Sequence, residues 1–554
     1  MTLFCAHKAI GTQIPTYFIE STAPDNVDDS PPPPFVDPRL QPLDPNLAAE
    51  EIAQHLAAAP RPNLVFMVHG FSNPQKVVLP VYAAASAAIE RDPAVVGARD
   101  GLVCVGYRWP SEKITGPWRG TFAALPLLPA WLLGVGFVVA VVLTLYLGWG
   151  SGAGGWRTAA HVVVVAAWAA VAIVVTAIVL RIAAYFRDSY RAQNYGAPDL
   201  VAIIRIINTR IVTLDNENGR PERKGEKRVQ LSFIGHSMGG LVVTNAIRVL
   251  SDLFADDASV RRPLLNDGIF NQATKRLREE RLRAGSEEWE RPKASPEIGD
   301  AFSVKRFVLV SPDIPAEALL SNRANFLQAS LLRFDEAFLF SNEGDEVLRQ
   351  ISTLANYFIF PTKTWKHGFR LGNVEILSEG YGVINPAPAD FLRTLRVGYY
   401  TLQQLYDHLK QARQDPADDY GAVQDRLPKV FTYFDCTDYR DRQYLAQEGR
   451  WGRVKPLLTY ALRTKRNDPK KGLSHLQHLW LLLSYIKINV HGGYFEGDLS
   501  EELMYRLACL GYGATLAAYG DIGMLSAACE AKQIRVLISP ELRHYGHPRP
   551  QGTP

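Results

Sequence analysis

The sequence is poor in cysteine and has no excess of charge of either sign. Its 5 cysteines are scattered over 554 residues, and none stands in a CxxC pair or at a Cys/His metal-ligand spacing. This argues against a disulfide-stapled secreted module and predicts reduced thiols in a cytosol-facing protein. The 60 basic and 56 acidic residues leave a net charge of +4, which gives no reason to expect a nucleic-acid partner. The first 20 residues lack a basic stretch followed by an apolar one, so no cleaved signal peptide is expected.

Charge is nearly absent from one long stretch of the chain. Between Arg119 and Arg181 the only Lys, Arg, Asp or Glu is Arg157. The apolar runs at residues 122–149 and 158–180 each exceed the roughly 20 residues with which an α-helix crosses a bilayer. A short Gly-rich turn, GSGAGG, separates them. The pattern predicts a transmembrane hairpin of two helices, with a lipid bilayer as a partner.

The predicted hairpin, residues 121–183, returns both of its flanks to the same side of the membrane. Against Arg157 alone in the turn, the flanks carry Lys113, Arg119, Arg181, Arg187 and Arg191. By the positive-inside rule, everything except the turn is expected to face the cytoplasm. The alternative is a buried helical hairpin in a soluble core, although such helices are usually shorter and keep some polar residues.

Short apolar runs and helical patterns alternate in the rest of the chain. The runs lack clean apolar–polar alternation, which is typical of strands buried on both faces of a parallel sheet. They are LVFMV (64–68), LVCVGY (102–107), VQLSFI (229–234), RFVLV (306–310), AFLF (337–340) and VFTYF (430–434). Amphipathic helical patterns cover residues 46–59 and 198–213. This alternation predicts an α/β fold with a doubly wound, mostly parallel sheet.

The sharpest motif joins one of these strands to a helix. GHSMGG (residues 235–240) directly follows VQLSFI and precedes the helical LVVTNAIRVL. In this strand–turn–helix context, G-x-S-x-G raises a nucleophilic serine, here Ser237, above the sheet edge, and the Met238 amide is positioned to bind an oxyanion. The strand LVFMV runs into the loop HGFS, where the amide of Phe71 is the second predicted oxyanion donor and His69 is expected to be structural.

These motifs resemble those of the α/β-hydrolase superfamily, and within it a group of bacterial hydrolases with MVHGF and WPS strand ends and a GHSMGG elbow. Here the motifs stand at residues 67–71, 109–111 and 235–240. The resemblance extends over about residues 60–120 and 185–495. It implies a serine hydrolase that forms an acyl-enzyme and needs no metal or organic cofactor. Together with the hairpin, it implies a catalytic domain on the cytoplasmic face of a bacterial inner membrane.

The superfamily's chain order is serine, acid, histidine, and it implies where the acid lies. The acid usually follows the second strand beyond the elbow. If RFVLV is the first strand and AFLF the second, the next loop is SNEGD, which ends in Asp345. Asp345 is therefore the predicted triad acid. Asp313, in the sequence SPD after RFVLV, is the alternative.

The base is expected in a loop beyond VFTYF. His491 stands in the Gly-rich sequence INVHGGYF, which resembles this group's histidine followed by an aromatic pair, and it is the predicted base. The other candidates are His475, His478, His544 and His547. The first two lie in a helical pattern and the last two in a Pro-rich tail.

The length suggests two or three structural units, or one domain with large insertions. We expect an N-terminal segment with a Pro-rich linker and a helix (1–59), a hydrolase domain in two parts (60–120 and 184–498) around the hairpin (121–183), and a C-terminal helical segment and tail (499–554). The expected function is a membrane-anchored serine esterase or lipase acting on acyl-ester or lipid substrates. An inactive hydrolase-fold membrane scaffold and a serine peptidase are the alternatives.

Overall fold

The structure is a computed structural model that describes most of the chain. It covers residues 4–23, 37–111, 165, 168, 182–221, 223, 227–254, 296–316, 330–331, 333–352, 370–377, 380–384, 400–401, 430–445, 450–462, 473–483, 488–539 and 542. The hairpin predicted over residues 121–183 lies outside the described residues except at 165, 168, 182 and 183, and it stays a prediction. No helix in the described part is long and apolar enough to cross a membrane.

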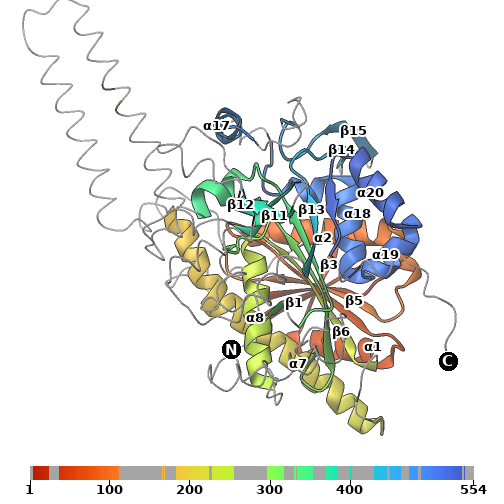
Figure 1. Cartoon of the computed structure of the whole chain (residues 1–554). Coiled ribbons are helices and arrows are strands. Elements are labelled where there is room, and N and C mark those ends of the chain that lie inside the picture. Colours follow the sequence, from red (N-terminus) through yellow and green to blue (C-terminus); the bar gives the residue numbers. More distant parts are fainter. Residues whose placement is uncertain are drawn as a thin grey trace, which may run out of the picture.

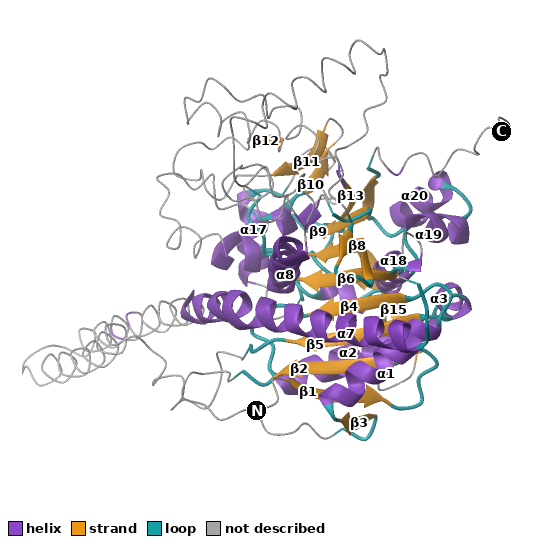
Figure 2. Cartoon of the chain, turned by 90° about the horizontal axis from the view of Figure 1, so that it is seen from below, coloured by secondary structure: helices purple, strands orange, loops and turns teal. Residues whose placement is uncertain are grey.

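A large, mostly parallel sheet forms the centre of the molecule (Figures 1 and 2). Its strand order is β16-β13-β9-β8-β6-β4-β5-β2-β1-β3, with the short β7 beside β8. The six predicted strands are all present in it, as β4 (Asn63–Val68), β5 (Leu102–Arg108), β6 (Val229–His236), β8 (Phe302–Val310), β9 (Glu336–Ser341) and β13 (Phe431–Asp435). Because neighbouring members of this set pair in parallel, their carboxyl ends share one edge of the sheet.

Helices cover both faces of the sheet, which confirms the predicted α/β fold (Figure 2). One face is covered by α1 (Pro45–Ala58), α7 (Ala197–Glu217) and α8 (Met238–Phe254). The other is covered by α2 (Gln75–Arg91), α3 (Pro93–Gly97), α18 (Asp498–Cys509), α19 (Tyr512–Tyr519) and α20 (Ile522–Ala531). The strands are buried on both sides by these layers, which is why their sequences are almost uniformly apolar.

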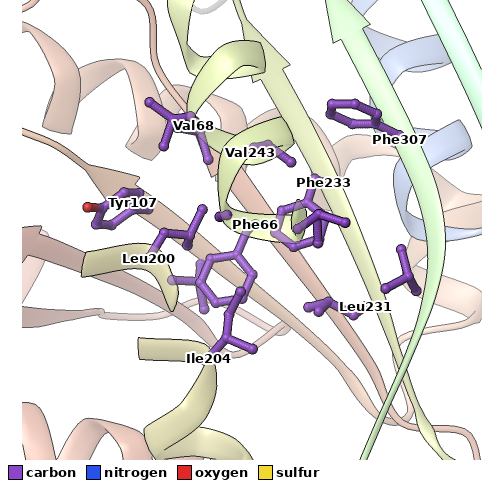
Figure 3. Packing of buried hydrophobic residues seen from close by; sticks show 14 of the residues in the cluster. Phe66, Val68, Tyr107, Leu200, Ile204, Leu231, Phe233, Val243 and Phe307 are labelled. Carbon is purple, nitrogen blue, oxygen red and sulfur yellow. The ribbon is translucent and has the colours of Figure 1, made fainter. Parts of the chain in front are cut away.

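The core beneath α7 and α8 shows this packing at close range (Figure 3). Phe66 of β4 and Phe233 of β6 are register partners, and their rings stack with centroids 5.7 Å apart. Leu200 and Ile204 of α7 pack into the same cluster and are almost fully buried. Burial of such side chains stabilises the fold by roughly 1.5–3 kcal/mol each.

Segments from the N-terminal and C-terminal parts of the chain belong to this sheet, which the sequence analysis did not predict. The first 59 residues supply β1 (Phe4–Ala9), β2 (Thr16–Ser21) and β3 (Leu40–Leu43), and β2 pairs in parallel with β5. At the other edge, β16 (Arg535–Leu537) pairs antiparallel with β13. The boundaries expected at residues 60 and 499 therefore do not divide the sheet. β2 was not recognised as a buried strand because it contains polar residues such as Glu20. Glu20 is buried because the Arg108 guanidinium of β5 forms an ion pair with it.

The short strand β7 (Glu297–Ile298) pairs with β8 in the main sheet. Two smaller sheets are also present. One is formed by β10 (Glu375–Leu377), β11 (Gly380–Ile384) and β12 (Tyr400–Thr401), and the other by β14 (Arg440–Leu445) and β15 (Arg450–Pro456). The remaining described helical elements are η1 (Ala192–Gly196), η3 (Val347–Ser352), η5 (Leu371–Asn373), α17 (His475–Leu483) and η6 (Gly493–Glu496).

Candidate active site

The turn between β6 and α8 has the geometry of a nucleophile elbow. Ser237 has a φ of +54°, which is a strained conformation for a residue with a side chain. A Cβ on Gly239 would lie 2.5 Å from the His69 carbonyl oxygen, and one on Gly235 would lie 2.7 Å from Gly240 Cα. Both positions therefore require glycine. The Ser237 amide donates to the Val310 carbonyl at 2.9 Å, which ties the turn to β8.

The elbow lies where the chain reverses its direction of winding through the sheet. After β4 the chain adds β5 on one side, and β6 then pairs with β4 on the other side. The loops that follow β4 and β6 diverge at such a switch point, and α/β folds bind their ligands there. These two loops carry Phe71 and Ser237.

A buried carboxylate–imidazole pair lies at the same edge. Asp345 is fully buried, and its Oδ2 lies 2.6 Å from Nδ1 of His491. Its Oδ1 accepts the backbone N–H groups of Val347 (3.1 Å) and Leu348 (3.2 Å), while the Ser311 hydroxyl donates to Oδ2. Four donors thus satisfy the carboxylate, and its bond to Nδ1 leaves the other ring nitrogen to accept a proton.

The two atoms that would react have no hydrogen-bond partner in the described part of the chain. They are Ser237 Oγ and His491 Nε2, and both are buried. The hydrogen bond that joins serine to histidine in a working triad is therefore not made here. Both groups border the loop after β4: a Cβ on Gly70 would lie 2.8 Å from Ser237 Cβ, and the Phe71 and His491 ring centroids are 6.4 Å apart. Catalytic hydrogen bonds are often long without substrate.

The charge of Asp345 controls the protonation of His491. Burial alone lowers the pKa of His491, but the negative charge of Asp345, its hydrogen bond and the charge of Asp313 together outweigh burial, and the pKa is raised overall. The neighbouring His236 behaves in the opposite way, because burial and the charge of His491 lower its pKa to about 3. His236 is therefore neutral at neutral pH.

His236 contacts the predicted base, and the sequence analysis did not identify it as part of the site. Its Nε2 lies 3.1 Å from the His491 carbonyl oxygen, and because a carbonyl can only accept, the ring donates from Nε2. The ring centroids of His236 and His491 are 4.9 Å apart. This contact holds the loop of the predicted base against the elbow. The only signal in the sequence was a hydrogen-bonding residue beside the elbow serine.

Of the two predicted oxyanion donors, Phe71 lies in the loop after β4 and Met238 directly follows Ser237. The backbone N–H groups of Phe71 and Met238 donate to no group among the described residues. Met238 begins α8, where the helix dipole favours negative charge. His69, in the same loop as Phe71, packs against Trp109. The ring centroids of the two residues are 5.1 Å apart, and the Trp109 indole N–H donates to the His69 carbonyl at 2.9 Å. Burial and the charge of Arg108 lower the pKa of His69 to about 3.

The alternative acid and base residues lie in other contacts. Asp313 forms a buried ion pair with Arg370 (Oδ1–Nε 3.1 Å), and the Ser352 hydroxyl donates to it at 3.1 Å. His478 is buried with its Nδ1 2.7 Å from Glu346. His475 is the first residue of α17, and His544 and His547 lie outside the described residues. The structure thus brings Asp345, not Asp313, to His491.

The groups present are those that acyl transfer uses: a serine in a strained turn, a histidine oriented by a buried carboxylate, and two backbone amides without a partner among the described residues. In the described part of the chain, no three His, Cys, Asp or Glu side chains are placed to hold a metal ion. Neither a family model, nor a curated protein, nor a solved structure matches this chain.

Proposed function

We propose that this protein is a membrane-anchored serine hydrolase of the α/β-hydrolase type that cleaves acyl esters. One observation carries the proposal: Oδ2 of the fully buried Asp345 lies 2.6 Å from His491 Nδ1, and the His491 loop contacts His236, the residue before a serine with a φ of +54°. A buried carboxylate that orients an imidazole, with the second ring nitrogen left to take a proton, is the arrangement that activates a serine hydroxyl.

In the proposed first step, Ser237 Oγ attacks the carbonyl carbon of an ester while His491 Nε2 takes the serine proton. The Asp345 carboxylate keeps the other ring proton on Nδ1 and stabilises the imidazolium that forms. The carbonyl oxygen becomes an oxyanion and accepts hydrogen bonds from the amides of Phe71 and Met238. Collapse expels the alcohol, which receives the proton from His491 and leaves an acyl group on Ser237.

In the second step, water attacks the acyl carbon and gives a proton to His491 Nε2. The tetrahedral intermediate again places its negative charge at the two amides. Collapse releases the carboxylic acid, and the proton returns to Ser237 Oγ. The hydrogen bond between Ser237 and His491 must form when substrate binds.

A fluorophosphonate probe tests for the activated serine. We expect the probe to react with Ser237 in the wild-type chain, and the Ser237→Ala variant to lose labelling while it stays folded. Ser232→Ala is the matched control, because Ser232 lies on β6, the strand that leads into the elbow, and like Ser237 it is fully buried and has an unpartnered hydroxyl. Labelling of Ser237→Ala at the wild-type level would contradict the proposal, and a folded wild type without labelling would favour the inactive scaffold.

The proposed substrate is an acyl ester or lipid at the membrane surface. The reason is the apolar stretch of residues 121–183, which would hold the catalytic domain near acyl chains. Extraction of membranes tests this anchor: we expect detergent, but not high salt, to release the protein. An ester panel measured beside a peptide panel separates the proposed esterase or lipase from a serine peptidase, for which cleavage of peptides alone is expected.

A further inference from the structure

A third buried carboxylate lies beside the proposed site and takes no part in the steps above. Asp188 lies in the helical residues 182–191 and is fully buried. Its Oδ2 accepts the backbone N–H of Ser72 at 2.9 Å and the hydroxyl of Ser111 at 2.7 Å. The Ser111 hydroxyl in turn accepts the backbone N–H of Asn73 at 3.1 Å. One carboxylate thus holds two consecutive amides, one directly and one through a serine.

These two amides directly follow Phe71, whose own amide is the proposed oxyanion donor. Ser72 has a φ of +58°, a conformation that costs about 1–3 kcal/mol in a residue with a side chain and persists only where its surroundings impose it. The bond from the Ser72 amide to Asp188 is such a constraint. Without it, the peptide between Phe71 and Ser72 would be free to relax, and the direction of the Phe71 N–H with it.

The other carboxylate oxygen of Asp188, Oδ1, contacts two arginine side chains. Arg187 donates to Oδ1 at 2.9 Å, and an Arg191 guanidinium nitrogen lies 3.7 Å from the same atom. The arginines therefore balance the buried charge on one side while Oδ2 faces the loop. A charged acceptor makes hydrogen bonds about twice as strong as a neutral one, which suits a group that must hold a strained turn.

A second contact from the same helical segment holds the side chain of Phe71. The Tyr185 ring meets the Phe71 ring edge to face, with centroids 5.9 Å apart. The Tyr185 hydroxyl accepts a hydrogen bond from Arg370 at 3.2 Å and is fixed in turn. Three residues apart in a helix, Tyr185 and Asp188 lie on the same face. That face contacts the oxyanion loop at two successive residues.

We propose that Asp188 is a positioning residue of the oxyanion hole: it holds the loop of residues 71–73 so that the Phe71 amide points at the developing oxyanion. This inference rests on the proposed function. It differs from the triad assignment because Asp188 acts through the loop and touches neither Ser237 nor His491. Asp188 should therefore affect the binding of the transition state far more than the binding of the ester.

The test compares Asp188→Asn with wild type, using the full chain in detergent micelles and p-nitrophenyl butyrate as substrate. We expect kcat to fall about 10²-fold, as when an oxyanion donor is lost, with KM little changed. The affinity for a trifluoromethyl ketone should fall by the same factor as kcat/KM, because the hemiketal places an oxyanion in the hole. The pH dependence of kcat/KM should not move, since the pair of His491 and Asp345 is untouched.

Asp92→Asn is the matched control. Asp92 is also a buried carboxylate that accepts a backbone N–H (Ala94, 2.9 Å) and pairs with an arginine (Arg506). It differs in place, because it precedes β5 and therefore lies at the amino ends of the parallel strands. The Asp92→Asn variant should be less stable than wild type but have the same kcat. If Asp188→Asn does not fold, Ser111→Ala is the second variant: it removes the hydroxyl that links Asp188 to the Asn73 amide and leaves the bond from Asp188 to Ser72 in place. A drop of about threefold to tenfold in kcat is then expected, the effect of one hydrogen bond.

Three outcomes would overturn the inference. A folded Asp188→Asn or Ser111→Ala variant with wild-type kcat shows that the loop needs no such anchor. A fall in kcat with unchanged ketone affinity places the effect outside the oxyanion hole. If Ser237→Ala keeps wild-type hydrolysis, the proposed function fails and this inference with it. In the first two outcomes, an inactive Ser237→Ala shows that the inference alone fails.

Discussion

The loops after β8 and β9 are neighbours at one sheet edge, and each carries a buried aspartate. Asp313 follows β8 and Asp345 follows β9, and neither is more than 1% exposed. Their partners differ. Asp313 faces the guanidinium of Arg370, whereas Asp345 faces the imidazole of His491. Residue type, burial and place in the fold are shared, so the partner alone separates a structural carboxylate from a candidate catalytic one.

The first loop also serves the second. Its Ser311 hydroxyl donates to the Asp345 carboxylate, and the backbone N–H of Asp313 donates to the Ser237 carbonyl at 3.1 Å. The loop after β8 therefore contacts both the elbow and the proposed acid. This comparison teaches that a buried acid near a nucleophile is informative only once its partner is known.

The largest expected effect comes from removing the charge of Asp345. We predict that Asp345→Asn lowers kcat about 10⁴-fold, the loss that follows when a triad histidine is no longer held in the correct tautomer. Asp313→Asn should keep the activity of each folded molecule within a small factor. Steady-state hydrolysis, normalised to the concentration of folded protein, measures both. The reverse result would assign the acid to the loop after β8.

The next largest effect is on the stability of the protein, and it is expected from substitution of Asp313. We predict that Asp313→Asn lowers the free energy of unfolding by about 3–5 kcal/mol, because the buried Arg370 guanidinium loses its carboxylate partner. Thermal unfolding in detergent measures the change. A double-mutant cycle with Arg370→Met supplies the control, and a coupling energy near zero would show that the ion pair does not hold this loop.

A smaller effect is expected from the serines that donate to each carboxylate. Ser311→Ala removes a donor from Asp345 and should lower kcat about tenfold, since a hydrogen bond to a charged group is worth about 1.5–3 kcal/mol. Ser352→Ala removes the corresponding donor from Asp313 and should leave kcat unchanged. Measuring kcat for the pair tests the comparison directly, and equal losses would contradict it.

The smallest effect is a movement of the pH profile. The base acts only when His491 is neutral, so kcat/KM falls as pH drops through its pKa, which Asp345 raises above the ordinary 6.5 against the effect of burial. We therefore expect the acid limb of wild type above pH 6.5. In Asp345→Asn burial is opposed only by the more weakly acting charge of Asp313, so the limb of the residual activity should move to lower pH. A limb that stays in place would mean that another group controls it.

Local sequence determined the elements on which the candidate site stands. Four to eight apolar residues in a run are buried on both faces, which specifies a strand of a parallel sheet, and all six predicted strands are found there. The elbow motif was readable because Gly235 is required by contacts within the strand–turn–helix unit itself, although Gly239 is required by the close approach of residues 68 and 69 at the end of β4. Both glycines stand at fixed positions in the motif, so the sequence alone shows them.

What the tertiary structure decided are the contacts between segments distant in sequence. Nothing near Glu20 indicates that Arg108 will neutralise it and admit β2 to the sheet. Nothing near Asp313 or Asp345 states which of them will meet His491, 146 residues beyond Asp345, and nothing near Asp188 points to Ser72. A carboxylate has the same chemistry wherever it stands, and only the fold supplies the cation, imidazole or amide that gives it a role.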